Sequence, residues 1–134
     1  MAETREAGLY KEACALIEGL ILLHDRPERQ LGAADRGRLE SALSLFQQVV
    51  ELNPGHWPAL WLMGKAHQRL GAFEAGLECF AAANRIKPDQ PDVAREAAIA
   101  AMDAGQAERA VGFCEVAIAA EPADAGLRAN LALA

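Results

Sequence analysis

The amino-acid sequence predicts an all-α fold, and three observations lead to that prediction. Alanine, the strongest helix former, supplies 30 of the 134 residues, whereas aromatic residues make up only 5%. Apolar residues recur at steps of three and four, which is the spacing of one helix face. A set of residue types also returns at a fixed interval of 34 residues. The length is that of about one domain.

The 34-residue interval joins seven columns of residues that share a type or a size. They are Gly37, Gly71 and Gly105; Glu40, Glu74 and Glu108; Ala42, Gly76 and Ala110; Leu43, Leu77 and Val111; Phe46, Phe80 and Cys114; Val49, Ala83 and Ala117; Pro54, Pro88 and Pro122. Each glycine is expected to end a first helix, because glycine adopts the left-handed conformation of a C-terminal cap without strain. Each proline is expected to end a second helix, since it has no N–H to continue it. Every unit is therefore predicted to be two helices joined by a turn.

Six complete helices and a partial seventh are expected. The first unit, residues 6–56, has a helix from Glu6 to about Leu23, an enlarged solvated loop at 24–36, and a second helix whose apolar stripe forms its core side: Leu39, Ala42, Leu43, Phe46, Val49, Val50 and Leu52. The units at 57–90 and 91–124 are regular, and residues 125–134 would begin a fourth unit or form a cap. The final apolar run, 131–134, favours a fragment of a longer protein and self-association through this end.

These residues resemble the tetratricopeptide repeat (TPR) family, whose units are 34-residue helix–turn–helix pairs. The middle unit, 57–90, is most similar in its large, small and aromatic positions, which are Leu60, Met63, Gly64 and His67 in its first helix and Gly76, Phe80, Ala83 and Pro88 in its second. The third unit keeps the pattern in its second helix but has alanine at the large positions of its first. The resemblance implies one TPR domain that forms a right-handed superhelical solenoid.

The sequence predicts no catalytic, metal or cofactor site. His24, His56 and His67 include no pair at the spacing that places two ligands on one helix face. The cysteines have no base beside them in sequence, and the scattered glycines form no phosphate-binding loop.

Composition also limits the setting and the partners. No apolar run reaches the roughly 20 residues of a membrane span, and the N-terminus does not resemble a secretory signal. Three cysteines at wide spacing favour a reducing, cytoplasmic compartment, and the net charge of −6 opposes nucleic-acid binding. Alanine with many more arginines than lysines suggests a GC-rich bacterial source.

A binding groove is implied by the resemblance, because the first helix of each TPR unit lines the concave side of the solenoid. The family's groove positions correspond here to Pro58, Trp61, Lys65, Gln68 and Arg69 and to Asp92, Arg95, Ile99, Met102 and Asp103. The binding residues are predicted to be Trp61, Lys65, Gln68, Arg69, Arg95, Ile99 and Met102. Trp61 lies outside the core columns, so it either contributes to binding or packs on a neighbouring helix.

Three of these groove residues, Lys65, Arg69 and Arg95, are expected to form a local basic spot. Leu62 and Glu96 stand where some TPR proteins hold a peptide's terminal carboxylate, so a clamp of that kind is not expected. The function expected from the whole pattern is a non-catalytic protein–protein interaction module that binds a peptide or helix. Two alternatives stay open, the N-terminal arm of a larger bacterial enzyme such as a glycosyl- or methyltransferase, and a self-associating scaffold.

Overall fold

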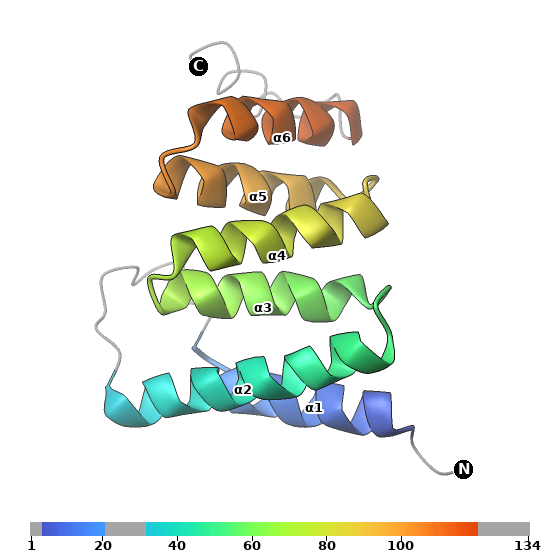
Figure 1. The fold of residues 1–134 in the computed structure, drawn as a ribbon, viewed down its shortest axis with the longest axis vertical. Coiled ribbons are helices and arrows are strands. Elements are labelled where there is room, and N and C mark those ends of the chain that lie inside the picture. Colours follow the sequence, from blue (N-terminus) through green and yellow to red (C-terminus); the bar gives the residue numbers. More distant parts are fainter. Residues whose placement is uncertain (1–3, 21–31, 121–134) are drawn as a thin grey trace.

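Six α-helices make up the computed structural model, which describes residues 4–20 and 32–120. They are α1 (Arg5–Ile17), α2 (Ala33–Leu52), α3 (Trp57–Arg69), α4 (Phe73–Ile86), α5 (Pro91–Asp103) and α6 (Ala107–Ala120). The described residues contain no β-strand. The helices are stacked in chain order, with α1 and α2 at one end and α6 at the other (Figure 1). The predicted all-α helical-repeat solenoid is therefore confirmed.

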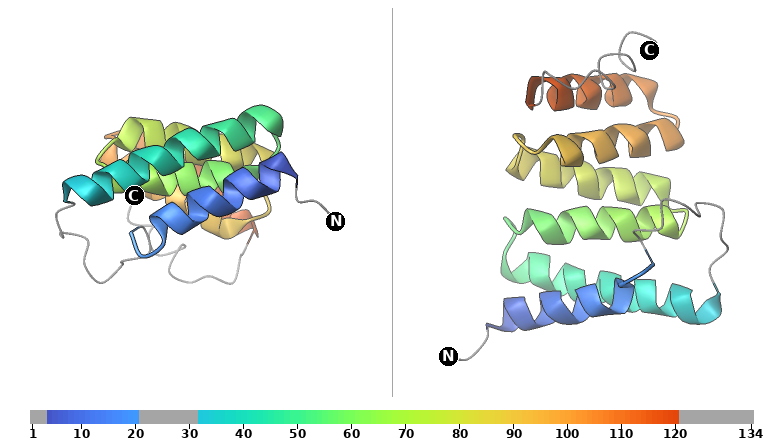
Figure 2. Two further views of the ribbon diagram at one scale, coloured as in Figure 1. Left: turned by 90° about the horizontal axis from the view of Figure 1, so that it is seen from below. Right: turned by 180° about the vertical axis from the view of Figure 1, so that it is seen from behind.

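The helices pack as three consecutive pairs. Contacts are densest between α1 and α2, between α3 and α4, and between α5 and α6, and they are sparsest between α2 and α3. Seen from below, α1 and α2 lie side by side, with the other pairs stacked behind them (Figure 2). The odd-numbered helices α1, α3 and α5 consequently share one face of the stack, and the even-numbered helices share the other.

Glycine ends α3 and α5 as the repeat predicts. Gly71 has φ +82° and Gly105 has φ +76°, both in the left-handed region. Around Gly71, the N–H of Ala72 donates to His67 O at 2.8 Å and the N–H of Gly71 donates to Gln68 O at 3.0 Å. This pair of bonds is a Schellman cap, which satisfies carbonyls that the helix end leaves free.

The first unit departs from the predicted pattern in three ways. Helix α1 ends at Ile17 rather than near Leu23, and the glycine with left-handed φ after it is Gly19, at +79°. Helix α2 begins at Ala33, so the prediction of a loop at 24–36 is wrong for residues 33–36. Gly37 lies within α2 and ends no helix. The alanines at 33 and 34 favour helix strongly enough to carry one exposed glycine, which costs about 1 kcal/mol relative to alanine.

Small residues allow α3 and α4 to approach closely. A Cβ on Gly64 would lie 2.7 Å from the Phe80 ring, and a Cβ on Gly76 would lie 3.1 Å from Gly64 O. Phe80 and Leu77 are fully buried at this contact. Packing thus requires glycine at position 64, whereas a side chain at position 76 would need Gly64 O to move by a few tenths of an ångström.

The core follows most of the apolar stripe predicted for the second helix of the first unit, in which Leu43 and Val50 are partly buried. In α2 the buried side chains are Leu39, Ala42, Phe46 and Val49, whereas Leu52, at the end of the expected stripe, is 49% exposed. In α5 the alanines of the third unit are buried, as expected of small residues that bring helices together: Ala94, Ala97, Ala98 and Ala101.

Some expectations concern residues outside the described ranges. They are the loop at 24–31, His24, and the fourth unit or cap at 125–134 with its proposed role in self-association. Within the described ranges, no helix combines the length and the apolar character that a membrane crossing requires.

Candidate functional site

The face formed by α1, α3 and α5, which we call the odd-helix face, has two adjoining cavities with mainly apolar lining. The smaller, about 290 Å³, is formed where α1, α3 and the start of α5 meet, by Tyr10, Trp57, Pro58, Trp61, Leu62, Gln90, Asp92 and Val93. The larger, about 390 Å³, lies between α1 and α3 and is lined by Cys14, Ala15, Ile17, Glu18, Gly19, Trp61 and Leu62. Ligand pockets in proteins commonly measure about 300–1,000 Å³, so these two half-open cavities are near the lower end of that range.

Trp61 and Leu62 line both cavities and so stand at the centre of this face. Trp61 is partly buried, and its ring packs against both of the larger hydrophobic clusters of the core. The indole Nε1 is buried and finds no hydrogen-bond partner in the described part of the chain. Trp61 therefore packs on neighbouring elements, which is one of the two roles that the sequence left open, and it also lines both cavities. Its contribution to binding stays a prediction.

Local sequence fixes the start of α3 and thereby the position of Trp61. The N-cap is His56, whose Nδ1 accepts a hydrogen bond from the Ala59 N–H at 3.1 Å. Pro58 lies in the first turn, where its missing N–H leaves no helical bond unmade. Trp61 then follows Pro58 by three residues and precedes Lys65 by four, so the three lie along one face of α3.

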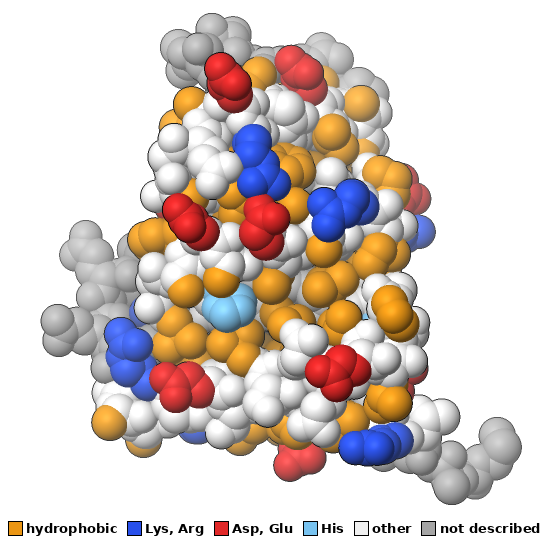
Figure 3. All heavy atoms as spheres, viewed as in Figure 1, with side chains coloured by type: hydrophobic (Ala, Val, Ile, Leu, Met, Phe, Trp, Pro, Cys, Tyr) orange, Lys and Arg blue, Asp and Glu red, His pale blue; other side chains and the backbone are white. Residues whose placement is uncertain are grey.

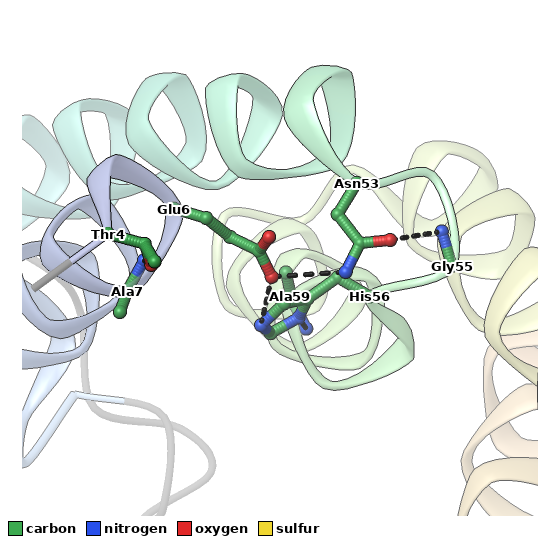
Figure 4. A network of polar contacts seen from close by, with 7 residues as sticks. All are labelled: Thr4, Glu6, Ala7, Asn53, Gly55, His56 and Ala59. Carbon is green, nitrogen blue, oxygen red and sulfur yellow. Dashed lines mark hydrogen bonds and ion pairs between the residues drawn. The ribbon is translucent and has the colours of Figure 1, made fainter.

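A polar network ties α1 to the turn between α2 and α3 (Figure 4). Glu6 Oε2 accepts a hydrogen bond from Asn53 Nδ2 at 3.0 Å and lies 3.7 Å from His56 Nε2. Because Nδ1 of His56 is an acceptor, its neutral ring carries the proton on Nε2, which faces Glu6. Asn53 Oδ1 in turn accepts from the Gly55 N–H at 3.1 Å. The network holds the N-terminal part of α1 beside the start of α3.

Tyr10 is a lining residue that the sequence did not single out. Its ring lies 4.7 Å from the His56 ring and 5.9 Å from the Phe46 ring, measured between centroids. Burial, together with the charge of Cys14 and a hydrogen bond to it, raises the pKa of Tyr10 to about 12. Tyr10 is thus a neutral aromatic wall of the smaller cavity. The spacing of Tyr10, Cys14 and Ile17 at steps of four and three is the sequence signal that marks this face of α1.

Two of the three cations that were expected to form a basic spot are paired with acids of the chain itself. Lys65 is 7% exposed; its Nζ lies 2.9 Å from Glu96 Oε1 and 5.3 Å from the centroid of the Trp61 ring. Arg95 Nη1 lies 2.8 Å from Asp92 Oδ1. The sequence could not reveal the first of these pairs, since it joins α3 to α5 across 31 residues.

The other predicted groove residues lie in different surroundings. Arg69 Nε donates to the carbonyl of Leu20 at 3.2 Å, just after α1. The side chain of Gln68 faces α4, with its Cγ 3.6 Å from where a Gly76 Cβ would be. Ile99 and Met102 are exposed on α5, at 46% and 63%. The structure therefore brings Lys65 against the Trp61 ring, with only Trp61 of the two lining the cavities, and places Gln68 at the contact between α3 and α4.

The described side chains offer little for catalysis or metal binding. All three cysteines are free, and burial raises the pKa of each thiol, for Cys79 to about 11. They are accordingly protonated near neutral pH and poor nucleophiles. Burial lowers the pKa of His67, which keeps that ring neutral. Among the residues at 4–20 and 32–120, no three His, Cys, Asp or Glu side chains are grouped to hold a metal ion.

The chain is a helical-repeat protein, because its helices stack in consecutive pairs to form a solenoid. Its two cavities lie on the face formed by the odd-numbered helices. The model of the tetratricopeptide repeat family matches residues 33–100, just over half of the sequence. The chain therefore belongs to the tetratricopeptide repeat family. No curated protein sequence matches it.

Several solved structures share the fold at low sequence identity. MamA 41-end from Desulfovibrio magneticus RS-1 superposes with a TM-score of 0.69 at 18% identity, over 96% of this chain and 63% of that one. PcrH, in complex with the chaperone binding region of PopB, gives 0.69 at 18%, over 99% and 94%. The first TPR of Spaghetti (RPAP3), bound to an HSP90 peptide, gives 0.64 at 14%, over 92% and 90%. The chain spans less than two thirds of the length of the MamA chains.

Proposed function

We propose that this protein is a non-catalytic interaction module that binds a peptide or helix of a partner protein on its odd-helix face. The observation that carries the proposal is the position of Trp61, which lines both cavities and is only partly buried. Tryptophan is over-represented among the residues that dominate binding energy, because its large ring fills a desolvated pocket. Two apolar cavities beside it can take two side chains of one segment.

The proposed binding residues are Trp61, Lys65, Gln68, Arg69, Arg95, Ile99 and Met102. Trp61 supplies apolar area, with Ile99 and Met102 as exposed apolar contacts on α5. Lys65 acts mainly by holding α3 to α5 through its ion pair with Glu96. Arg69 acts by holding the end of the first helix through its hydrogen bond to the Leu20 carbonyl. Two proteins with a similar fold support the proposal of a peptide ligand. PcrH is in complex with the chaperone binding region of PopB, and the first TPR of Spaghetti is bound to an HSP90 peptide.

The test uses peptides selected from a displayed random library. It compares their affinities for two full-length variants, each with one shortened side chain. Trp61→Leu keeps apolar contact with the core but removes the indole from both cavities, and it is expected to weaken binding at least about tenfold, which corresponds to 1.4 kcal/mol. Leu52→Ala is the matched control, since Leu52 is a half-exposed apolar residue on α2 that lines neither cavity. Isothermal titration calorimetry measures both affinities, and circular dichroism checks that both variants fold. Equal affinities would contradict the groove assignment.

The wider setting is proposed on chemical grounds. Three free thiols and an acidic net charge of −6 support a cytoplasmic protein whose partner is a protein and not a nucleic acid. The same binding face would serve a scaffold protein or the TPR arm of a larger enzyme. The composition favours a bacterial source. Self-association is checked by light scattering of the full chain: a mass that rises with concentration supports it, and a constant monomer mass contradicts it.

A further inference from the structure

The tryptophans and the tyrosine of this protein are gathered at one place. The sequence contains two tryptophans and one tyrosine, and all three of them line the smaller cavity, as Trp57, Trp61 and Tyr10. Each of these side chains is partly buried and packs against the largest buried cluster of the core. The core therefore holds the rings in place, while the rest of their surface forms a wall of the cavity.

The described lining of the smaller cavity has no unpaired charge. Its one charged lining residue is Asp92, whose Oδ1 already lies 2.8 Å from Arg95 Nη1. The hydroxyl of Tyr10 is hydrogen-bonded to Cys14. A charged side chain of a ligand would lose its hydration in this cavity without gaining a counter-charge, which is unfavourable. The charge of the lining is therefore complementary to an uncharged group.

Proline is an uncharged residue whose chemistry matches this lining closely. Its ring is apolar and packs against aromatic faces, which is how aromatic-lined grooves recognise proline-rich segments. Proline also has no N–H, so its backbone brings no donor that would stay unpaired in a mainly apolar cavity. A proline-rich segment is already extended in the polyproline II conformation before it binds, and it consequently loses less conformational entropy on binding.

We propose that the smaller cavity binds a proline ring, and that the partner segment at the odd-helix face is an extended, proline-containing segment. The inference rests on the proposed function, and it chooses the extended peptide from the two kinds of ligand that the proposed function leaves open. Trp57, Trp61 and Tyr10 provide the aromatic surface for the ring. Gln90, which also lines the cavity, brings a side-chain amide that can donate to a carbonyl of the segment.

Selection from a displayed library of random dodecapeptides tests the class of ligand. The full-length protein is immobilised, and only peptides whose binding is lost on Trp61→Leu are retained. These peptides are expected to be enriched in proline relative to the unselected library. In synthetic copies without tryptophan, replacing the proline by alanine should weaken binding by about tenfold. Titration is followed by tryptophan fluorescence, which reports on this cavity because both tryptophans of the sequence line it.

Variants of Trp57 then test whether the aromatic surface gives the preference, because Trp57 lines only the smaller cavity. Trp57→Leu keeps an apolar side chain but removes the ring, and it should bind the proline peptide and its alanine copy equally. Trp57→Phe keeps a ring and should restore the preference for proline. Phe73→Leu is the matched control, since Phe73 is an aromatic residue of α4 that is 39% exposed and lines neither cavity. Circular dichroism checks that each variant folds.

The outcomes separate this inference from the proposed function. Retained peptides without proline enrichment, such as peptides with apolar residues at steps of three and four, would overturn the inference and leave the binding face intact. Equal affinities of the proline peptide and its alanine copy for the unmodified protein would overturn it as well, whether or not the Trp57 variants fold. A folded Trp57→Leu that keeps the full preference would contradict the role given to the rings. If no peptide depends on Trp61, the proposed function itself fails.

Discussion

Phe80 and Met102 should differ widely in what they contribute to stability. Phe80 is fully buried and its ring fits the space left by Gly64, so Phe80→Ala should lower the free energy of unfolding by about 3–5 kcal/mol. Met102 is 63% exposed, and Met102→Ala should change it by about 0.5 kcal/mol or less. Urea denaturation measures both. Equal costs would mean that the register assigned to the third unit is wrong.

Single residues also show where sequence reasoning about the site succeeded and where it stopped. Trp61 could be picked out because it breaks the apolar columns of a regular unit. Tyr10 and Glu18 could not, since the 34-residue interval does not set the register of α1. The Lys65–Glu96 pair depends on how α3 lies beside α5. Spacing along one helix carries no information about such a pairing between two helices.

Among the helices and turns, one repeat column contains glycines in opposite roles. Gly71→Ala places a Cβ in the left-handed region and should cost about 1–2 kcal/mol. Gly37→Ala replaces glycine inside α2 with nothing within 4 Å of the new Cβ, and should stabilise by up to about 1 kcal/mol. Thermal unfolding followed by circular dichroism compares the two. A shift of both midpoints in the same direction would contradict the structural assignment of this column.

The difference between these two glycines explains how far the sequence predicted the elements. Around Gly71 and Gly105 the glycine signal and the next helix start agree, and the structure follows the repeat. Around Gly37 the helix propensity of the alanines before it outweighs the glycine signal, and α2 starts four residues earlier. Gly19 belongs to no column, so its role in ending α1 was not predicted. Local propensity decided these boundaries where the repeat is irregular.

Across the whole molecule, consecutive helices contact each other least where the first pair meets the rest of the stack. In a solenoid each unit contacts only its neighbours, so stability is approximately a sum of unit and interface contributions. Contacts between α2 and α3 are the sparsest of any consecutive pair. The Glu6 network and the Tyr10 ring supply additional contacts from α1 to the start of α3. The pair α1–α2 is therefore expected to open before the other two.

Glu6→Ala is the variant that isolates this interface, because it removes the acceptor of Asn53 Nδ2 and the carboxylate facing His56. The loss of a hydrogen bond to a charged group, about 1–2 kcal/mol, should speed amide exchange in α1 and α2 by about 5–30-fold. Exchange in α5 and α6 should stay unchanged, since those helices do not touch the network. Arg109→Ala is the control: it removes an exposed bridge from α6 to Glu78 on α4, and exposed pairs contribute little. Uniform acceleration in all six helices of the Glu6 variant would show that the stack opens as one cooperative unit, and that the sparse contact between α2 and α3 is not a separate point of opening.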